Sequence, residues 1–271
     1  MDLIHLEDRA IIRITGRDTH HLLQGLITNN MDTLIQDGVI YSALLSPQGK
    51  YQYDFFLFQD EEVVYCDILR CDAEAFVKKL TMYRLRADVT FEILHDMHVL
   101  WSVHECSVPH AFIHKDPRHL DMGYRIVTHS LPDKIKNDTV YHIHRIQLGL
   151  AEGAYDAVKD KTLLLEMHYD AIHAIDFHKG CYVGQEVTAR SKYRANIRKK
   201  IYVLKANEDF SDMDIDIIAD DTILGERRSF CANHALALLH SEKLQHAIDS
   251  KKRVLCNDIE VRATLPNLAH Q

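Results

Sequence analysis

The chain has 271 residues, of which 46% are hydrophobic and 27% are charged, and its formal net charge is −8. This length predicts one large or two to three compact units, and the negative charge argues against a general nucleic-acid-binding surface. No segment reaches the roughly 18 apolar residues of a membrane span. The first residues show neither the basic region nor the apolar run of a secretion signal.

The cysteines and histidines are dispersed along the chain. The six cysteines include no Cys-x-x-Cys pair, which argues against a self-contained zinc or cluster site and against a disulfide framework. The 19 histidines are scattered and lack carboxylates at ligand spacing, so we expect no metal site among them. We therefore expect a reduced, cytoplasmic protein that binds neither nucleic acid nor membranes.

The first half of the chain predicts short strands with two helices between them. The helices are expected to begin at Asp18 and Asp72. Residues 106–123 show no clear hydrophobic periodicity, which predicts a loop. The turn Ser46-Pro47-Gln48-Gly49 joins two of the strands. This order predicts an α+β sandwich with helices on one sheet face. Strands are expected at residues 9–15, 41–45, 50–58, 63–69, 89–94, 98–103 and 124–127.

The second half begins with a helix that starts at Asn137 or Asp138 and runs through Ile146 and Leu150, and Gly149 and Gly153 mark its end. Beyond residue 200 the pattern changes to short strands separated by Asp-rich turns, which predicts a small barrel or sandwich. These strands are expected at residues 201–204, 215–218, 222–225, 235–239 and 259–263. Between the two parts lies a basic run that could attract an anion or simply be solvated, formed by Arg190, Lys192, Arg194, Arg198, Lys199 and Lys200.

The most informative stretch is Lys179-Gly180-Cys181-Tyr182-Val183-Gly184-Gln185-Glu186. It predicts a glycine-bracketed loop that turns into a helix near Cys181 or Tyr182, with Glu186 and Arg190 at helical spacing. A thiol at the start of a helix and two residues from Lys179 would favour the thiolate form. Cys181 is therefore a candidate reactive or metal-seeking sulfur, and the alternative is a small buried cysteine in a tight turn.

This motif resembles the signature of the YgfZ-type folate-binding proteins. These are relatives of the glycine-cleavage T-protein and of the mitochondrial assembly factors for four-iron clusters. The resemblance implies an α+β fold of the GcvT type, a cloverleaf of two ferredoxin-like subdomains and a small C-terminal β-barrel. It implies a discontinuous folate-binding subdomain, 1–45 with 137–195, a second subdomain, 46–136, and the barrel, 196–271.

The resemblance also implies tetrahydrofolate, or a one-carbon derivative, as the cofactor. Glu166 matches the family's Pro-x-Glu element, with leucine in place of proline, and a carboxylate there suits the two-donor edge of a pterin. Asp54 follows the turn where the aminomethyltransferases carry two aspartates, and Tyr53 replaces the other one. Thr28 and Asn29 are weaker candidates near the folate cavity. The remaining expected folate-site residues come from the motif and the helix that follows it: Tyr182, Gln185, Glu186 and Arg190.

Two functions follow from the resemblance. The first is a tetrahydrofolate-binding accessory protein for assembly or repair of iron–sulfur clusters, with Cys181 as the functional thiol, Lys179 as its activator, and iron–sulfur enzymes or assembly proteins as partners. The alternative is a tetrahydrofolate-dependent aminomethyltransferase. The replacement of one aspartate by Tyr53 and the complete cysteine motif both favour the first, which is not a conventional enzyme.

Overall fold

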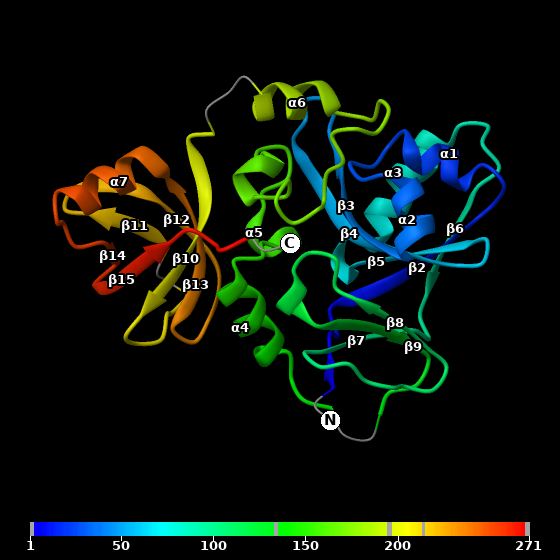
Figure 1. Ribbon diagram of the computed structural model, residues 1–271, viewed down its shortest axis with the longest axis horizontal. Coiled ribbons are helices and arrows are strands. Elements are labelled where there is room, and N and C mark those ends of the chain that lie inside the picture. Colours follow the sequence, from blue (N-terminus) through cyan, green and yellow to red (C-terminus); the bar gives the residue numbers. More distant parts are fainter. Residues whose placement is uncertain (1–2, 133–134, 194–196, 213–214, 269–271) are drawn as a thin grey trace.

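The computed structural model describes residues 3–132, 135–193, 197–212 and 215–268. Figure 1 shows the barrel at one end of the long axis, the two open sheets at the other, and helices between them. No helix within these ranges is long and apolar enough to cross a membrane. The predicted boundary at residues 195–196 and the side chain of Arg194 lie outside the described residues.

The first sheet has five strands in the order β3-β4-β5-β2-β6. One face is covered by three helices, and their apolar side chains form a core with Ile12, Phe55 and Leu57. The neighbouring β4 residues Phe56 and Phe58 point to the other face and belong to a second core, as the alternation of a strand requires. The elements are β2 (Arg9–Thr15), β3 (Val39–Leu45), β4 (Tyr51–Asp60), β5 (Val63–Leu69), β6 (Thr90–Leu94), α1 (Thr19–Gln24), α2 (Met31–Asp37) and α3 (Ala73–Arg84).

The second sheet has four strands in the order β1-β7-β9-β8. It shares the second core with the first sheet and with α4, through Trp101, Tyr141 and Ile146. Strand β8 lies within the stretch predicted to be a loop. Its five residues are only half-buried or exposed, so they lack the alternation that identifies a strand. The elements are β1 (Ile4–His5), β7 (His98–Ser102), β8 (Ala111–Lys115), β9 (Tyr124–Thr128), α4 (Thr139–Leu148) and α5 (Gly153–Asp156).

The first sheet contains residues from both predicted α+β subdomains. The predicted boundary between residues 45 and 46 falls in the turn that joins β3 to β4, and these strands pair from Val39 with Phe58 to Leu45 with Tyr51. In the described residues the chain passes from one sheet to the other between β1 and β2 and again between β6 and β7.

The C-terminal part is a closed barrel with the strand order β10-β13-β12-β11-β14-β15, as the sequence predicted. Asp156 of α5 ties it to the rest of the protein, because one carboxylate oxygen accepts hydrogen bonds from Ser229 of β12 and the other accepts one from Arg145 of α4. The sequence did not predict α7, which packs Leu244 and Ala247 onto the barrel. The elements are β10 (Lys199–Ala206), β11 (Asp216–Ala219), β12 (Thr222–Cys231), β13 (His234–His240), α7 (Ser241–Asp249), β14 (Leu255–Cys256) and β15 (Ile259–Thr264).

Candidate functional site

The loop that carries Cys181 lies at the surface, just before α6 (Gln185–Tyr193). Its cysteine is exposed, whereas its neighbours Lys179 and Tyr182 are each only 7% exposed. Burial raises the pKa of Tyr182 to about 12. The thiol is therefore presented on a short exposed segment held by a buried residue on either side. This excludes the alternative of a buried cysteine in a tight turn.

The predicted activation of Cys181 by a helix start is not observed. Helix α6 begins at Gln185, later than the predicted start at Cys181 or Tyr182, because Gly184 has a φ of +81° and is not helical. Lys179 also faces elsewhere. Its ammonium donates to the backbone carbonyls of Ile27 at 2.8 Å and Asn29 at 2.6 Å. Burial lowers the pKa of Lys179 to about 8. Lys179 is thus an anchor of the loop.

Gly184 is needed for contact between the motif and the turn at residues 46–49. A β-carbon on Gly184 would lie 2.6 Å from the carbonyl oxygen of Ser46 and 3.0 Å from the Cα atom of Gly49. Gly49 has a φ of +70°, and its own β-carbon would lie 2.7 Å from Val187 of α6. The cysteine motif and the turn at residues 46–49 therefore pack directly on each other. Gly184 and Gly49 allow this close approach because they have no side chain.

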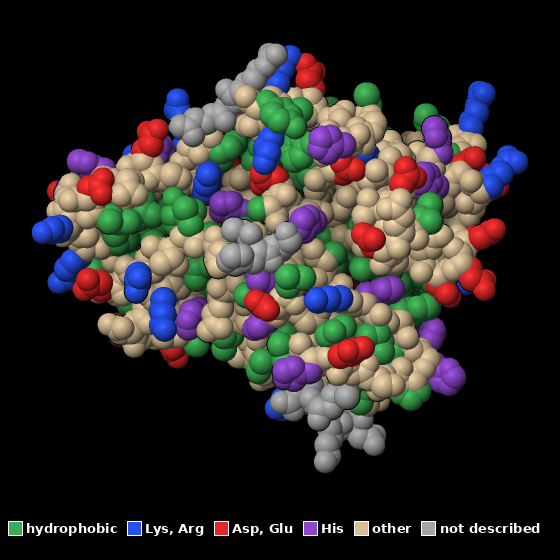
Figure 2. All heavy atoms as spheres, viewed as in Figure 1, with side chains coloured by type: hydrophobic (Ala, Val, Ile, Leu, Met, Phe, Trp, Pro, Cys, Tyr) green, Lys and Arg blue, Asp and Glu red, His purple; other side chains and the backbone are tan. Residues whose placement is uncertain are grey.

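The remaining motif residues lie on the outside of α6. Glu186 and Arg190 form an exposed ion pair one turn apart. Gln185 is half-buried, and its amide approaches the carbonyl of Gly180 at 3.5 Å. Lys192 from the basic run pairs with Asp170 at 2.5 Å. Figure 2 shows Lys and Arg side chains mixed with Asp and Glu over the face in view, and histidines scattered among them.

Asp54 is buried at the centre of the molecule and is surrounded by hydrogen-bond donors. Its carboxylate accepts from the hydroxyls of Tyr41, Tyr51 (2.8 Å) and Tyr169 (2.9 Å), and from the backbone N–H of Gly153 (2.8 Å). Burial first, and then the Asp54 charge, raise the pKa of all three tyrosines well above its usual value. Asp54 therefore has four partners within the protein, which does not fit its predicted bond to a pterin.

Glu166 is half-buried in the short helical turn η3 (Leu164–Met167). One of its carboxylate oxygens accepts a hydrogen bond from the backbone N–H of Leu163 at 2.8 Å. In return, the backbone N–H of Glu166 donates to the carbonyl of Leu163 at 3.0 Å. The two bonds together cap the turn. Glu166 thus has a local structural role in this conformation.

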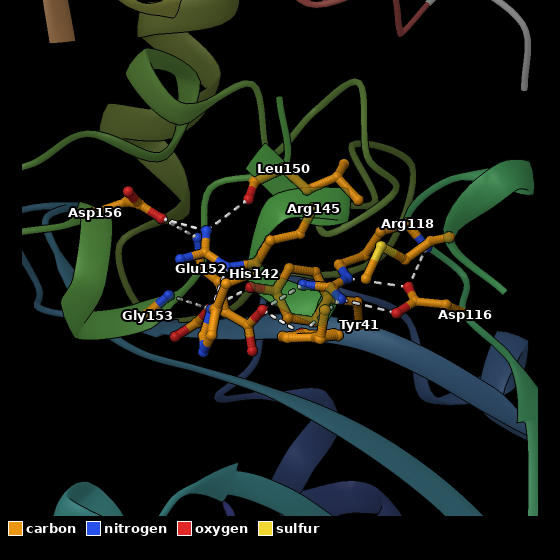
Figure 3. A network of polar contacts seen from close by, with 12 residues as sticks. Tyr41, Asp116, Arg118, His142, Arg145, Leu150, Glu152, Gly153 and Asp156 are labelled. Atoms are coloured by element: carbon orange, nitrogen blue, oxygen red, sulfur yellow. Dashed lines mark hydrogen bonds and ion pairs between the residues drawn. The ribbon is translucent and has the colours of Figure 1, made fainter. Parts of the chain in front are cut away.

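Next to Asp54 lies a network of buried ion pairs (Figure 3). Glu152 is its centre and accepts hydrogen bonds from Arg9 and Arg118, both at 3.0 Å, and from Tyr141. Burial by itself would raise the pKa of Glu152, but the guanidinium groups of Arg118 and Arg9 hold it well below 4.5. The network joins both sheets and α4, since its other ion pairs are Arg9–Asp67, Arg125–Asp67, Arg118–Asp116 and Arg145–Asp156.

A cavity of about 770 Å³ opens beside this network. It is lined by residues of α2 and β3, by residues 115–120 and by residues 173–178. Its wall combines apolar side chains such as Ile175 and Phe177 with the polar groups of Asn29, Asp176 and Lys192. Cavities of this size and composition suit organic ligands. Among the described residues, its lining includes Asn29 but none of the main folate-site candidates, Asp54, Glu166, Tyr182, Gln185, Glu186 and Arg190.

Sequence reasoning missed this wall because its residues come from four separate segments of the chain, the last of which contributes Lys192 and Tyr193 of α6. Asn29 was a weak candidate, and the structure places it in the wall, while Thr28 is fully buried behind it. The signal that could have found residues 173–178 was their position directly before the cysteine motif. Within the described ranges, no three His, Cys, Asp or Glu side chains converge to hold a metal ion.

Comparison with known proteins supports the fold. The family described as "CAF17, C-terminal beta-barrel domain" matches residues 198–271. The crystal structure of the glycine cleavage system aminomethyltransferase T from Bartonella henselae superposes with a TM-score of 0.71, at 12% identity, over 98% of this chain and 85% of that one. The GcvT-type α+β fold with a C-terminal barrel is thus confirmed.

The sequence relatives are iron–sulfur cluster assembly factors by name. The Pyricularia oryzae homolog of IBA57 is 32% identical over 72% of this chain and 55% of its own length, so the chain spans just over half of that relative. The relatives are mitochondrial proteins, which contradicts the expected cytoplasmic location. Composition and dispersed cysteines are shared by proteins of several reducing compartments and could not separate them.

The match to the human protein extends over most of both chains. The mitochondrial iron–sulfur cluster assembly factor IBA57 of Homo sapiens is 30% identical to this chain, over 89% of the chain and 78% of the human protein. The alignment therefore leaves out only about a tenth of this chain. This chain belongs to the IBA57 family of iron–sulfur cluster assembly factors.

Proposed function

We propose that this protein assists the assembly or repair of iron–sulfur clusters and that Cys181 supplies its functional thiol. The exposed position of Cys181, between the buried side chains of Lys179 and Tyr182, carries the proposal. A thiolate that ligates iron or captures sulfur from another molecule must be accessible and held in place. The membership of the chain in a family of assembly factors supports the same role.

The thiol would act together with groups from another molecule. Iron–sulfur clusters generally take several cysteine ligands, and one side chain cannot supply them. In the described part of the chain, no cluster of metal-ligating side chains surrounds Cys181. The other ligands would come from an iron–sulfur assembly protein, an iron–sulfur enzyme or a small thiol that docks on the Cys181 loop.

We further propose that the cavity binds tetrahydrofolate or a one-carbon derivative. The volume of about 770 Å³ is sufficient for a flat heterocycle with a flexible tail. Ile175 and Phe177 offer apolar surface. Asp176 offers its Oδ2 atom to a donor of the pterin edge, since Oδ1 accepts from the backbone N–H groups of His178 and Lys179. Lys192, which pairs with Asp170, offers a cation for the anionic tail. Calorimetric titration with tetrahydrofolate tests this proposal.

Aminomethyl transfer is not favoured by the geometry. That chemistry needs a carboxylate positioned beside the folate. Asp54 is the carboxylate retained at the position where the aminomethyltransferases have two, and it accepts four hydrogen bonds from protein groups. The structure of the Bartonella henselae aminomethyltransferase is only 12% identical to this chain in sequence, so that similarity supports the fold and not the reaction.

A complementation experiment with two cysteine variants tests the role of Cys181. Cells that lack their own assembly factor receive the wild-type chain, Cys181→Ala or Cys71→Ala, and the activity of an iron–sulfur enzyme is measured together with the amount of each protein. Cys71 is a matched control because it is also an exposed thiol. We expect Cys181→Ala to abolish rescue and Cys71→Ala to retain it. Equal rescue by both variants would refute a functional thiol at Cys181.

A further inference from the structure

The wall of the cavity is cross-linked to the segment that leads to Cys181. Thr28 donates from its hydroxyl to the carbonyl of Ala174 at 2.7 Å, and Asn29 donates from its amide to the carbonyl of His173 at 2.7 Å. In return, the backbone N–H of Asp176 donates to the carbonyl of Thr28 at 3.0 Å. Residues 27–29 and 173–179 thus form one hydrogen-bonded unit, which we call the clamp.

The clamp reaches the cavity at one end and the thiol at the other. Asn29, His173 and Asp176 line the cavity. The carboxylate of Asp176 accepts from the backbone N–H of Lys179 at 3.2 Å, and Cys181 follows two residues later. A ligand that contacts the wall therefore touches residues that also position the start of the Cys181 loop.

Lys179 closes the clamp. Its buried ammonium bonds to the carbonyls of Ile27 and Asn29, and bonds to a charged donor are the stronger kind. Within the described residues it makes no hydrogen bond or ion pair with Cys181. The backbone beyond it is less confined, since a β-carbon on Gly180 would meet no described atom within 4 Å.

The loop has a second anchor outside the described lining of the cavity, and the ammonium of Lys179 lies 5.2 Å from the centroid of its Tyr182 ring. Tyr182 is buried, and Gly184 packs on the turn at residues 46–49. Neither residue lines the cavity in the described part of its wall. Of the two anchors, Lys179 is the one whose side chain bonds to the residues of the wall.

We propose that Lys179 is a positioning residue that couples the cavity to Cys181, so that a ligand in the cavity restrains the loop that presents the thiol. A bound ligand that holds Asn29 and Asp176 in place keeps both carbonyl acceptors aligned with the ammonium of Lys179. The identity of the ligand rests on the proposed binding of tetrahydrofolate, whereas the mechanical link rests on the contacts of the clamp alone.

Hydrogen exchange in the ligand-free protein tests the mechanical link. We compare the wild type with Lys179→Met and with the control variant Lys243→Met. Lys243 also donates from its ammonium to a backbone carbonyl, that of Ile223, but it lies in α7, which packs on the barrel. Loss of a charge-assisted bond should speed local opening roughly tenfold. We expect this increase in Lys179→Met at residues 27–30 and 174–180, and no increase there in Lys243→Met. Unchanged exchange at residues 27–30 in Lys179→Met overturns the proposal.

A trifluoromethyl tag on Cys181, in a Cys71→Ser background, reports on the transmission itself. Tetrahydrofolate should shift or narrow the fluorine resonance of the tag in the wild type, and should still bind Lys179→Met without changing its resonance. An equal response in both proteins overturns the coupling. If neither the tag nor the exchange at residues 27–30 responds to tetrahydrofolate, the folate proposal fails. The exchange of the ligand-free Lys179→Met variant then still shows whether Lys179 holds the clamp together.

A second variant covers the case in which Lys179→Met fails to fold. Thr28→Val keeps the shape of the side chain and removes the hydroxyl, which donates to the carbonyl of Ala174 and accepts from the backbone N–H of Ala43. The variant therefore disturbs the clamp at the end that adjoins the cavity wall. We expect faster exchange at residues 176–180, and an unchanged rate at these residues contradicts the coupling.

Discussion

Gly184 and Gly180 belong to the same motif but have different surroundings. Gly184 has a positive φ and lies close to the backbone of the turn at residues 46–49, whereas a β-carbon on Gly180 would meet no described atom within 4 Å. A non-glycine residue in the left-handed region costs about 1–2 kcal/mol before any clash. The two glycines therefore differ in what a methyl group would do to the fold.

Gly184→Ala should lower the free energy of unfolding by at least about 1–2 kcal/mol, while Gly180→Ala should change it by less than about 0.5 kcal/mol. Chemical denaturation of both variants and the wild type measures the difference. An equal loss in the two variants would show that the contact with the turn at residues 46–49 does not constrain the motif.

The sequence located the important loop but not the contacts of its side chains. The motif around Gly180, Cys181 and Gly184 predicted a reactive or metal-seeking thiol at the start of a helix. The bonds of Lys179 to Ile27 and Asn29 join residues about 150 positions apart, and no local pattern reveals such a pair. The same holds for Asp54, whose tyrosine partners come from three separate segments.

At the scale of elements, a bulge in β4 explains the position of Asp54. The register between β3 and β4 shifts between Leu44 and Leu45. An extra residue in one strand turns the following side chains to the opposite face. Tyr51 and Asp54 can therefore face the same side and form a hydrogen bond, although they are three positions apart.

Asp54→Asn should mainly reduce stability. An amide lacks the charge that the three tyrosine hydroxyls and the N–H of Gly153 stabilise. Its NH₂ group can only donate, and it would face these groups, which already donate. We expect a loss of about 3 kcal/mol in the free energy of unfolding, with little change in the calorimetric affinity for tetrahydrofolate. A large loss of affinity in a fully folded variant would restore Asp54 to the ligand site.

Several of the elements that the sequence missed are short or only partly buried. Helix α7 has nine residues and buries Leu244 and Ala247, which is too short a pattern to stand out among predicted strands. Strand β8 has no fully buried residue. Strands such as β4 and β13, with continuous buried runs, were predicted at nearly the observed positions.

At the scale of the whole molecule, the ion-pair network around Glu152 holds the sheets and α4 together. Its members come from β2, β5, β9, α4, α5 and the segment after β8. A buried carboxylate that loses its charge leaves the guanidinium groups of Arg9 and Arg118 without compensation, which costs several kcal/mol. The network should therefore control how the protein responds to acid.

The pH dependence follows from the lowered pKa of Glu152. Because this pKa is well below 4.5 in the folded protein, the unfolded chain takes up the proton first. The stabilisation is fully present above the unfolded pKa of about 4.5 and is lost as the pH falls toward the folded pKa. Glu152→Gln should lose roughly 3–5 kcal/mol at pH 7 and show a shallower fall in stability from pH 6 to pH 3.

Thermal unfolding over this pH range measures the effect, with Glu186→Gln as the control. Glu186 forms an exposed ion pair on α6, and exposed pairs contribute about 0.5 kcal/mol or less. Its removal should leave the pH profile of the wild type intact. If Glu152→Gln and the wild type lose stability in parallel on acidification, another carboxylate governs acid unfolding.

The closure of the barrel has a consequence for synthesis on the ribosome. Strand β10 pairs with β13 on one side and with β15 on the other, so its second edge has no partner until the final strand has been made. At about 5–20 residues per second, the nascent chain exposes this edge for several seconds. An unpaired edge next to apolar residues is a site of aggregation. Translation pauses before β15 should therefore be harmful to the yield of this protein, and chaperones that shield strand edges should improve it.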